Sequence, residues 1–263
     1  MGIEMGIGID VGSTTTKAVL IDSSDTILAK ALIQTGASAV QAIEKILGSI
    51  SSTSGFSLDE IPTVSTGYGR ARVELAQRAI TEITCHSVGV HRLNPDIRLL
   101  IDVGGQDAKV IRIGPSGRPD DFELNDKCSA GTGRFLEVMA RVLEVSIDEL
   151  GPLALKSNSP SSISSTCTVF AESEVIGHIG AGASPADIAA GLHTSMTSKI
   201  VALSKRVGFA EPVCVTGGVA LNPAFRYYLS KQLGTDLWVP DDPQLTGALG
   251  AAVLAMEKKG ASV

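Results

Sequence analysis

The sequence of 263 residues is poor in aromatic side chains, which make up 4% of it, and it has only four cysteines. Four cysteines in a chain of this length do not form the disulfide scaffold of a small secreted protein. A basic surface is also lacking, because 28 acidic residues outnumber 22 Lys and Arg and give a formal net charge of −6. An acidic chain does not favour general nucleic-acid binding, so we expect no nucleic-acid partner.

Long apolar runs are absent as well. The longest, such as residues 248–256, fall far short of the roughly 20 residues that cross a membrane as a helix. Residues 1–10 carry Glu4 and Asp10 but no Lys or Arg, and so lack the basic start of a signal peptide. We therefore expect no membrane association and a cytoplasmic location, where thiols stay reduced.

An internal repeat organises the chain, whose 44% hydrophobic and 19% charged residues are typical of one or two globular domains. Ile9-Asp10-Val11-Gly12 recurs as Ile101-Asp102-Val103-Gly104, and Lys17 is matched by Lys109 at the same spacing. Each copy reads as an apolar strand, a glycine turn and two further strands, followed by a helical pattern. The repeat predicts a duplicated α/β unit.

The predicted elements follow this repeat. Strands are expected at 18–21, 27–33, 110–113, 121–124 and 211–216, with Trp238 on a short strand. Helices are expected at 39–50, 135–143, 185–206, 222–233 and 247–258, and the third of these starts with Ser184 as N-cap and Pro185 at its first position. The serine-rich segments 51–55 and 156–165 are predicted to be loops. We expect a first domain at 1–96, onto which a C-terminal helix at 245–260 packs, and a second domain at 97–244.

Three glycine turns are candidates for nucleotide binding. The first, Asp10-Val-Gly-Ser-Thr-Thr-Thr-Lys17, can present backbone N–H groups and hydroxyls to a phosphate, although it lacks the Walker A spacing. The second is Asp102-Val-Gly-Gly-Gln-Asp107, and the third is Val215-Thr-Gly-Gly-Val219. Any one of them fits a tight hairpin, but three together, two of them duplicated, favour a phosphate site. The candidate phosphate-binding residues are Gly12, Ser13, Thr14, Thr15, Thr16, Lys17, Gly104 and Gly105.

Catalytic roles are expected at the two repeated aspartates. Asp10 and Asp102, on facing loops, can hold a hydrated Mg²⁺. Gln106 either orients the attacking water or only caps its turn. Lys17 and Lys109 fit phosphate contacts or strand-surface charges equally well, and Gln244 is a candidate contact to the nucleotide base.

These turns resemble those of the superfamily of actin, sugar kinases and heat-shock chaperone ATPases. The resemblance implies a duplicated ribonuclease-H-like fold, in which two domains close on ATP around a nucleotide cleft. It implies that residues 10–17 and 102–107 are the two phosphate loops and that 216–220, with Gly217, Gly218 and Ala220, is the adenosine motif. The small residues of 247–252 match the connecting helix at the hinge of that superfamily.

Two cysteines lie in polar, glycine- or serine-rich segments instead of apolar ones. Cys128 precedes a glycine turn and a helix, and Cys167 precedes a second helix. Thiolates near helix N-termini are stabilised by the helix dipole and by free N–H groups. The two do not form the closely spaced pair of a typical zinc site. Cys214 lies inside a predicted strand, and we expect it to pack in the core. Cys85, with His86 beside it, could suggest a metal ligand or a nucleophile, but no third group is identifiable, and we expect it to pack in the core too.

Over essentially its whole length the sequence resembles the activators of 2-hydroxyacyl-CoA dehydratases, the ATP-driven iron–sulfur proteins also called archerases. They are related to the ATPase subunits of benzoyl-CoA reductase, and the segments around Cys128 and Cys167 carry the most specific part of the resemblance. It implies that Cys128 and Cys167 of each subunit hold one 4Fe–4S cluster, shared across a homodimer. Independently, a four-thiolate cluster and two suitable thiols per chain favour a two-fold dimer.

The resemblance also implies the reaction. ATP binding and its hydrolysis to ADP, with Mg²⁺, drive one low-potential electron from the cluster to a dehydratase in anaerobic metabolism, and a ferredoxin or flavodoxin is the donor. Three alternatives stay open. The first is that the chain is the electron-donor component of a benzoyl-CoA-reductase-like or double-cubane reductase. The second is a cluster-free small-molecule kinase, and the third is a nucleotide-switch binding module.

Overall fold

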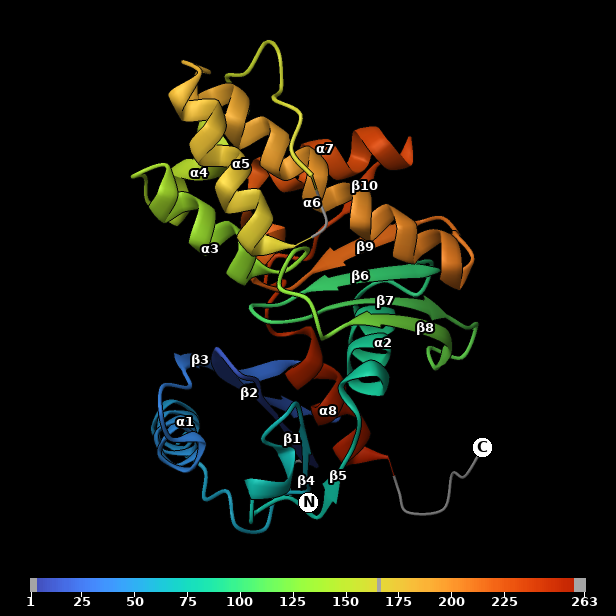
Figure 1. Cartoon of the computed structure of the whole chain (residues 1–263). Coiled ribbons are helices and arrows are strands. Elements are labelled where there is room, and N and C mark those ends of the chain that lie inside the picture. Colours follow the sequence, from blue (N-terminus) through green and yellow to red (C-terminus); the bar gives the residue numbers. More distant parts are fainter. Residues whose placement is uncertain (1–3, 165–166, 258–263) are drawn as a thin grey trace. The chain divides into compact units, whose positions relative to one another are not determined.

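The computed structural model describes residues 4–164 and 167–257. The chain forms two compact units, and each has its own five-stranded sheet (Figure 1). Unit 1 contains the described residues 4–97, 113–120 and 244–257. Unit 2 contains 98–112, 121–164 and 167–243.

The sheet of unit 1 has the strand order β3-β2-β1-β4-β5. Its strands are β1 (Met5–Val11), β2 (Thr15–Asp22), β3 (Ile27–Gln34), β4 (Thr63–Thr66) and β5 (Arg78–Ala79). The first three form the predicted antiparallel meander, whereas β4 pairs with β1 in parallel and β5 pairs with β4 in parallel. The short 3₁₀ helix η1 (Arg70–Arg72) follows β4.

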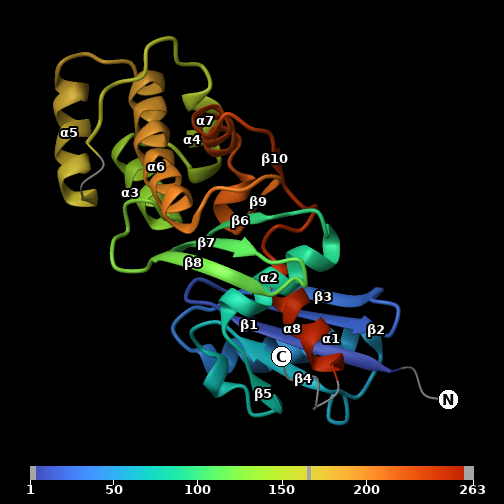
Figure 2. The same cartoon turned by 90° about the vertical axis from the view of Figure 1, so that its right-hand side faces the viewer.

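Alternating residues of β1 face opposite layers of helices (Figure 2). Ile7 and Ile9 pack against α1 (Ala39–Ser54), whereas Gly6 and Gly8 face α8 (Thr246–Met256). A Cβ atom added at Gly8 would lie 1.9 Å from the carbonyl oxygen of Ala248, so the helix backbone touches the strand. The helix α2 (Glu82–Leu93) is equally close to α8, because a Cβ at Gly250 would lie 1.8 Å from the carbonyl oxygen of Cys85. Glycine is therefore required where these backbones meet.

One predicted loop is wrong. Residues 51–54 form the last turn of α1, and the helix ends at Gly55, which has φ 75°. The hydroxyl of Ser51 donates to the carbonyl oxygen of Phe56 at 2.9 Å. The serine side chain thus bonds the segment that follows the helix. The predicted N-terminus is correct, and the Ser38 hydroxyl accepts from the backbone N–H of Gln41.

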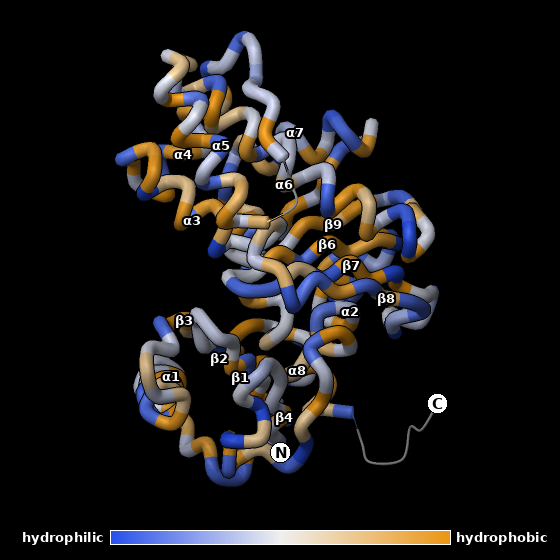
Figure 3. The backbone as a smooth tube through the Cα atoms, viewed as in Figure 1, coloured by the Kyte–Doolittle hydropathy of each residue, from blue (hydrophilic) through white to orange (hydrophobic). Residues whose placement is uncertain are grey.

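The sheet of unit 2 has the order β10-β9-β6-β7-β8 and repeats the topology of unit 1. Its strands are β6 (Leu99–Val103), β7 (Ala108–Ile113), β8 (Pro119–Asn125), β9 (Val213–Thr216) and β10 (Leu237–Trp238). The pair β6–β7 is antiparallel and β9 pairs with β6 in parallel, so β6 and β9 correspond to β1 and β4. These buried central strands are among the hydrophobic segments of Figure 3.

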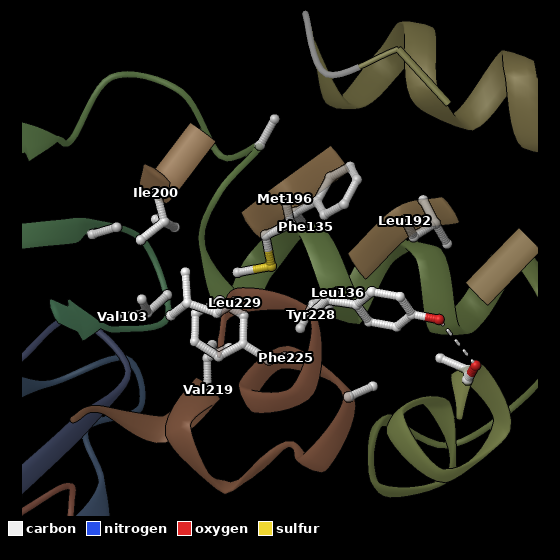
Figure 4. Packing of buried hydrophobic residues seen from close by; sticks show 14 of the residues in the cluster. Val103, Phe135, Leu136, Leu192, Met196, Ile200, Val219, Phe225, Tyr228 and Leu229 are labelled. Carbon is white, nitrogen blue, oxygen red and sulfur yellow. Dashed lines mark hydrogen bonds between the residues drawn. The ribbon is translucent and has the colours of Figure 1, made fainter. Parts of the chain in front are cut away.

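Helices cover one face of this second sheet (Figures 1 and 4). They are α3 (Gly133–Val142), α4 (Ile147–Ala154), α5 (Thr168–Gly180), α6 (Pro185–Val207), the short η2 (Gly218–Leu221) and α7 (Pro223–Leu233). Phe135 of α3, Met196 of α6 and Phe225 of α7 meet in a core that includes Val103 of β6. This core holds α3, α6 and α7 against the sheet.

The 23-residue helix α6 begins as the sequence predicts. Ser184 accepts from the N–H of Asp187 at 3.1 Å, and Pro185 occupies the first turn. Asp187 also accepts hydrogen bonds from the Ser157 hydroxyl at 2.6 Å and the Ser159 N–H at 3.2 Å. These bonds, the Ser157 bond first, lower the pKa of Asp187 and tie the loop before α5 to α6.

The predicted loop 156–165 has no helix or strand through residue 164, and residue 165 lies outside the described residues. The predicted helix at 247–258 matches α8, which ends at Met256, so the prediction is wrong at Glu257, whose backbone is extended. Residues 258–260 lie outside the described part of the chain. Among the described helices, we find none with the length and apolarity that crossing a membrane requires.

Candidate functional site

The first phosphate turn lies where β1 passes into β2. Asp10 and Lys17 are direct partners in the antiparallel register, and Lys17 Nζ lies 3.1 Å from Asp10 Oδ2. The Gly12 N–H donates to the Thr15 carbonyl oxygen at 3.1 Å and closes a tight turn. Asp10 is only 3% exposed. A buried carboxylate is thus held beside a turn that extends toward solvent.

The hydroxyl residues of this turn differ in position. Ser13 is exposed, whereas Thr14 and Thr15 are half-buried. Thr16 is fully buried, and its hydroxyl shares a hydrogen bond of 3.0 Å with that of Thr35. Its side chain therefore supports the turn from inside.

The second turn repeats this arrangement between β6 and β7. Lys109 is the register partner of Asp102, and its Nζ lies 3.4 Å from Asp102 Oδ2 and 2.7 Å from Asp107 Oδ2. The N–H of Gly104 donates to the Asp107 carbonyl oxygen at 2.9 Å, which leaves Gly105 half-buried and Gln106 exposed at the tip. Lys109 is 2% exposed, so it is not a surface charge.

In each copy a parallel strand, β4 or β9, lies beside the strand that carries the aspartate. Sequence reasoning identified the turn after β9 but missed the one after β4. Thr216 of β9 lies beside Asp102 in the parallel register, and its hydroxyl donates to Asp102 Oδ1 at 2.7 Å. Thr66 of β4 lies beside Asp10 in the same way. Gly67 and Gly217 follow these threonines, and both have φ 85°. The Thr-Gly pair after each buried strand was the available signal.

Both glycines permit a close approach to the adjoining strand. A Cβ at Gly67 would lie 2.5 Å from the Val11 carbonyl oxygen, and one at Gly217 would lie 2.2 Å from that of Val103. Gly218 is exposed at the start of η2, whereas Ala220 is fully buried. Gln244, which belongs to unit 1, is half-buried.

Gly247, in the first turn of α8, lies close to both His86 and the Asp10 carboxylate. A Cβ at Gly247 would be 2.9 Å from His86 Nε2 and 3.3 Å from Asp10 Oδ2. His86 Nδ1 shares a hydrogen bond of 3.0 Å with the hydroxyl of Thr246 at the start of α8. The sequence places His86 next to Cys85 and so gave no sign of this proximity.

The backbone of the loop that carries Cys128 is held by hydrogen bonds from two side chains. Asn125 Nδ2 donates to the carbonyl oxygens of Cys128 at 3.0 Å and Ala130 at 3.2 Å. The Thr132 hydroxyl donates to the Ser129 carbonyl oxygen at 2.8 Å. Gly131 has φ 111°, a conformation that favours glycine. Cys128 is partly exposed.

The same loop is bonded to the second phosphate turn. The N–H of Gly133 donates to the Gly104 carbonyl oxygen at 2.9 Å, and the N–H of Arg134 donates to that of Gly105 at 2.8 Å. These are two of the N–H groups that a helix start leaves without partners in the helix. The N-terminus of α3 is therefore fastened to the turn of Asp102.

Cys167 is the N-cap residue of α5 and is also partly exposed. The hydroxyls of Ser129 and Thr168, each directly after a candidate cysteine, share a hydrogen bond of 2.6 Å. The carboxylate of Glu174 accepts a short hydrogen bond from the N–H of Ser164, which ties the preceding loop to α5. The structure thus brings the two cysteine segments together within one chain.

The other two cysteines are core residues, as predicted. Cys85 and Cys214 are both 0% exposed. Burial raises the pKa of Cys85 to about 12. Burial, with a smaller effect of the Asp102 charge, raises the pKa of Cys214 well above its ordinary value. Both stay protonated at neutral pH, so neither suits a metal ligand.

Within the described residues, no three His, Cys, Asp or Glu side chains lie close enough together to hold a metal ion.

The sequence model of the BadF/BadG/BcrA/BcrD ATPase family matches residues 7–255. The chain belongs to this ATPase family. The predicted ATPase assignment is confirmed.

Three relatives of this ATPase are named as activators. A 2-hydroxyisocaproyl-CoA dehydratase activator of Clostridioides difficile is 44% identical, over 96% of this chain and 95% of its own. An activator of lactoyl-CoA dehydratase of Anaerotignum propionicum is 45% identical, over 95% and 97%. An (R)-2-hydroxyglutaryl-CoA dehydratase activating ATPase of Acidaminococcus fermentans is 42% identical, over 96% and 97%. A benzoyl-CoA reductase component of Thauera aromatica is 34% identical, over 65% and 63%.

Solved structures agree with the predicted fold. Component A of the (R)-2-hydroxyglutaryl-CoA dehydratase of Acidaminococcus fermentans matches with a TM-score of 0.91 at 40% identity, over 96% of this chain and 97% of its own. The 2-hydroxyisocaproyl-CoA dehydratase activator from Clostridium difficile, solved with bound ADPNP, matches with 0.88 at 44%, over 96% and 94%. A Streptomyces griseus glucokinase shares the fold, with a TM-score of 0.58 at 15% identity, over 95% and 98%. The duplicated α/β ATPase fold is confirmed.

Proposed function

We propose that this ATPase is an ATP-hydrolysing activator that delivers a low-potential electron from a 4Fe–4S cluster to a 2-hydroxyacyl-CoA dehydratase. The observation that carries the proposal is the 42–45% identity to three named activators, over nearly the whole length of both chains. The pairing of the two cysteine segments through Ser129 and Thr168 supports it, because this is the part of the chain that an electron carrier needs.

The two aspartate turns are assigned to ATP and Mg²⁺. Asp10 and Asp102 are buried carboxylates at strand ends whose charge is balanced by lysines, and they fit a hydrated Mg²⁺ held through water. When bound, Mg²⁺ neutralises phosphate charge during hydrolysis. Gln106, exposed at its tip, orients the attacking water.

The remaining nucleotide contacts divide between phosphate and adenosine. We assign the phosphates to Gly12, Ser13, Thr14, Thr15, Lys17, Gly104 and Gly105, with Thr16 supporting its turn from the core. The adenosine contacts are Gly217, Gly218, Ala220 and Gln244. Backbone atoms of Ala220 make its contact, since its side chain is buried.

Cys128 and Cys167 are assigned to the cluster. They fit it because both thiols are partly exposed, both follow polar segments, and their neighbours are hydrogen-bonded to each other. A 4Fe–4S cluster usually takes four thiolates, and Cys85 and Cys214 are buried elsewhere. Two copies of the chain therefore supply the set, so the working form is a homodimer. When bound, the cluster supplies storage and release of one electron.

The hydrogen bonds from α3 to the second turn connect the segment proposed to bind ATP with the segment proposed to hold the cluster. Any change in the Gly104–Gly105 carbonyls on binding or hydrolysis of ATP acts directly on Gly133 and Arg134, which follow the Cys128 loop. Such coupling requires that ATP and ADP differ in affinity for two states of the turn. It connects nucleotide state to electron delivery without a separate relay.

The wider setting follows from this function. The electron donor is a ferredoxin or flavodoxin, the acceptor is the dehydratase, and the protein works in the cytoplasm. We keep the predicted functional domains, which are 1–96 with the C-terminal helix predicted at 245–260, and 97–244.

Anaerobic purification tests the proposal. We expect a brown, oxygen-sensitive dimer with about four irons, which hydrolyses ATP and activates a 2-hydroxyacyl-CoA dehydratase only when ATP is present. Cys128→Ala and Cys167→Ala should lose the iron and retain ATP binding, whereas Cys214→Ala should keep the iron. An iron-free monomer that phosphorylates a sugar would contradict the proposal and favour a kinase. An iron-containing dimer that reduces a benzoyl-CoA-reductase-like partner instead would reassign the acceptor.

A further inference from the structure

A lysine from a distant part of the chain reaches one of the two candidate cluster cysteines. Lys199 lies in the middle of α6, and its Nζ is 3.8 Å from Cys128 Sγ. This is within hydrogen-bond distance for a sulfur acceptor, and the contact is partly buried. The nucleotide and cluster assignments above give Lys199 no role.

The position of Lys199 is set from two sides. Its helix is anchored in the core by Met196 and Ile200, which are 1% and 0% exposed. Its side chain passes Gly131, where an added Cβ would lie 3.7 Å from Lys199 Cδ and 3.8 Å from its Cβ. Because Asn125 holds the carbonyl oxygen of Cys128, the cysteine backbone is fixed as well. The backbones of Lys199 and of Cys128 are therefore both held in place, the first by the core and the second by Asn125.

We propose that Lys199 is a positioning residue for Cys128: it orients the ligand sulfur by an N–H···S hydrogen bond and places a positive charge at the edge of the cluster. This inference rests on the proposed function, since it needs a cluster at Cys128. Hydrogen bonds to the ligand sulfurs and the local charge are among the factors that set the potential of an iron–sulfur cluster.

The direction of the effect follows from charge. Uptake of one electron from an external reductant makes the cluster more negative by one unit, and a nearby cation stabilises that reduced state more than the oxidised one. Lys199 therefore raises the reduction potential and makes loading by the donor easier. Removal of its charge should move the potential to a more negative value.

Redox titration of the reconstituted holoprotein tests this, with electron paramagnetic resonance as the readout and iron content measured in parallel. The variants are Lys199→Gln and Lys199→Arg, and Lys205→Gln is the matched control, because Lys205 is exposed on the same helix. We expect Lys199→Gln to weaken electron uptake on the order of tenfold, which is about 59 mV for one electron. Lys199→Arg should stay nearer the wild type, and Lys205→Gln should match it.

The outcomes separate this inference from the proposed function. A Lys199→Gln protein with the same potential and spectrum as the wild type and Lys205→Gln would overturn the inference while the proposed function stands. Loss of iron from Lys199→Gln but not from Lys199→Arg would support the positioning role. A wild-type chain that takes up no cluster after anaerobic reconstitution with iron and sulfide would overturn the proposed function, and this inference with it.

Discussion

The backbone N–H of Gly133, at the start of α3, donates to the carbonyl oxygen of Gly104 at 2.9 Å. One residue is in the turn after Asp102 and the other directly follows the loop of Cys128. The neighbouring bond from Arg134 to Gly105 makes the connection double. Two backbone hydrogen bonds therefore join the turn after Asp102 to the segment that follows Cys128.

Substitution of Gly133 tests this connection. A Cβ there would lie 3.1 Å from the Gly104 carbonyl oxygen and 3.3 Å from Gly105 Cα, so Gly133→Ala must displace the turn or the helix. We expect ATP binding to remain and ATP-dependent activation of the dehydratase to fall by at least about tenfold, a coupling loss of about 1.4 kcal/mol. Nucleotide affinity and activation are measured on the same preparation.

The control for this substitution is Gly177→Ala in α5, where an added Cβ meets no atom within 4 Å. It should leave the coupling between ATP and activation unchanged. Equal effects of the two variants on activation at equal stability would contradict the coupling through Gly104.

Glycine contacts between α8 and its neighbours should be intolerant of a methyl group. Gly250→Ala places a Cβ 1.8 Å from the Cys85 carbonyl oxygen, and Gly8→Ala places one 1.9 Å from that of Ala248. We expect each to lower the free energy of unfolding by about 1–3 kcal/mol, or more where the backbone cannot shift. Urea unfolding of the metal-free protein measures the change.

The same exchange in open space should have the opposite sign. Gly48 lies inside α1 with no atom within 4 Å of an added Cβ. Gly48→Ala should therefore stabilise the protein by roughly 0.5–1 kcal/mol, because alanine favours a helix. A loss of stability at Gly48 comparable to that at Gly250 would refute the close-approach explanation.

Removal of the buried Lys109 should take a counter-charge away from two carboxylates. Lys109 contacts both Asp102 and Asp107, and its side chain is 3% exposed, whereas the corresponding Lys17 side chain is 14% exposed. Lys109→Met should cost about 3–5 kcal/mol of unfolding free energy. Lys17→Met should cost less, because the Lys17 side chain is more exposed and contacts one carboxylate instead of two. Chemical denaturation of both variants compares them, and a larger cost at Lys17 would be inconsistent with this ranking.

The stability of unit 2 should depend on pH through His193. This residue is fully buried on α6, where Nδ1 donates to the Ala189 carbonyl oxygen at 2.7 Å and Nε2 accepts from Asn222 Nδ2 at 3.0 Å. Burial lowers its pKa from the ordinary 6.5, so the folded protein holds it neutral. The unfolded chain therefore binds more protons as the pH falls below 6.5.

His193 thus contributes stability that is present above its unfolded pKa and is lost as the pH falls toward its folded pKa. His193→Gln should reduce the loss of unfolding free energy between pH 7.5 and 5.5, although it is less stable at pH 7.5. An unchanged slope in His193→Gln would rule out this source of pH dependence.

The sequence by itself determined the repeat, many of the strands and helices, and the burial of Cys85 and Cys214. Each of these depends on local patterns: the recurrence of Ile-Asp-Val-Gly, apolar periodicity, and the polar surroundings of Cys128 and Cys167 against the strand that contains Cys214. The pairing of Asp10 with Lys17 also follows from a short hairpin, because its register is set within eight residues.

Only the tertiary structure decided which distant residues share a site. It placed Thr66 and Gly67 beside Asp10, His86 near Gly247, and Lys199 at Cys128. It also placed the Thr16 side chain in the core, where its hydroxyl bonds Thr35. Parallel strand pairing and helix crossing bring together segments whose sequences carry no mark of one another, so no local pattern could have specified these contacts.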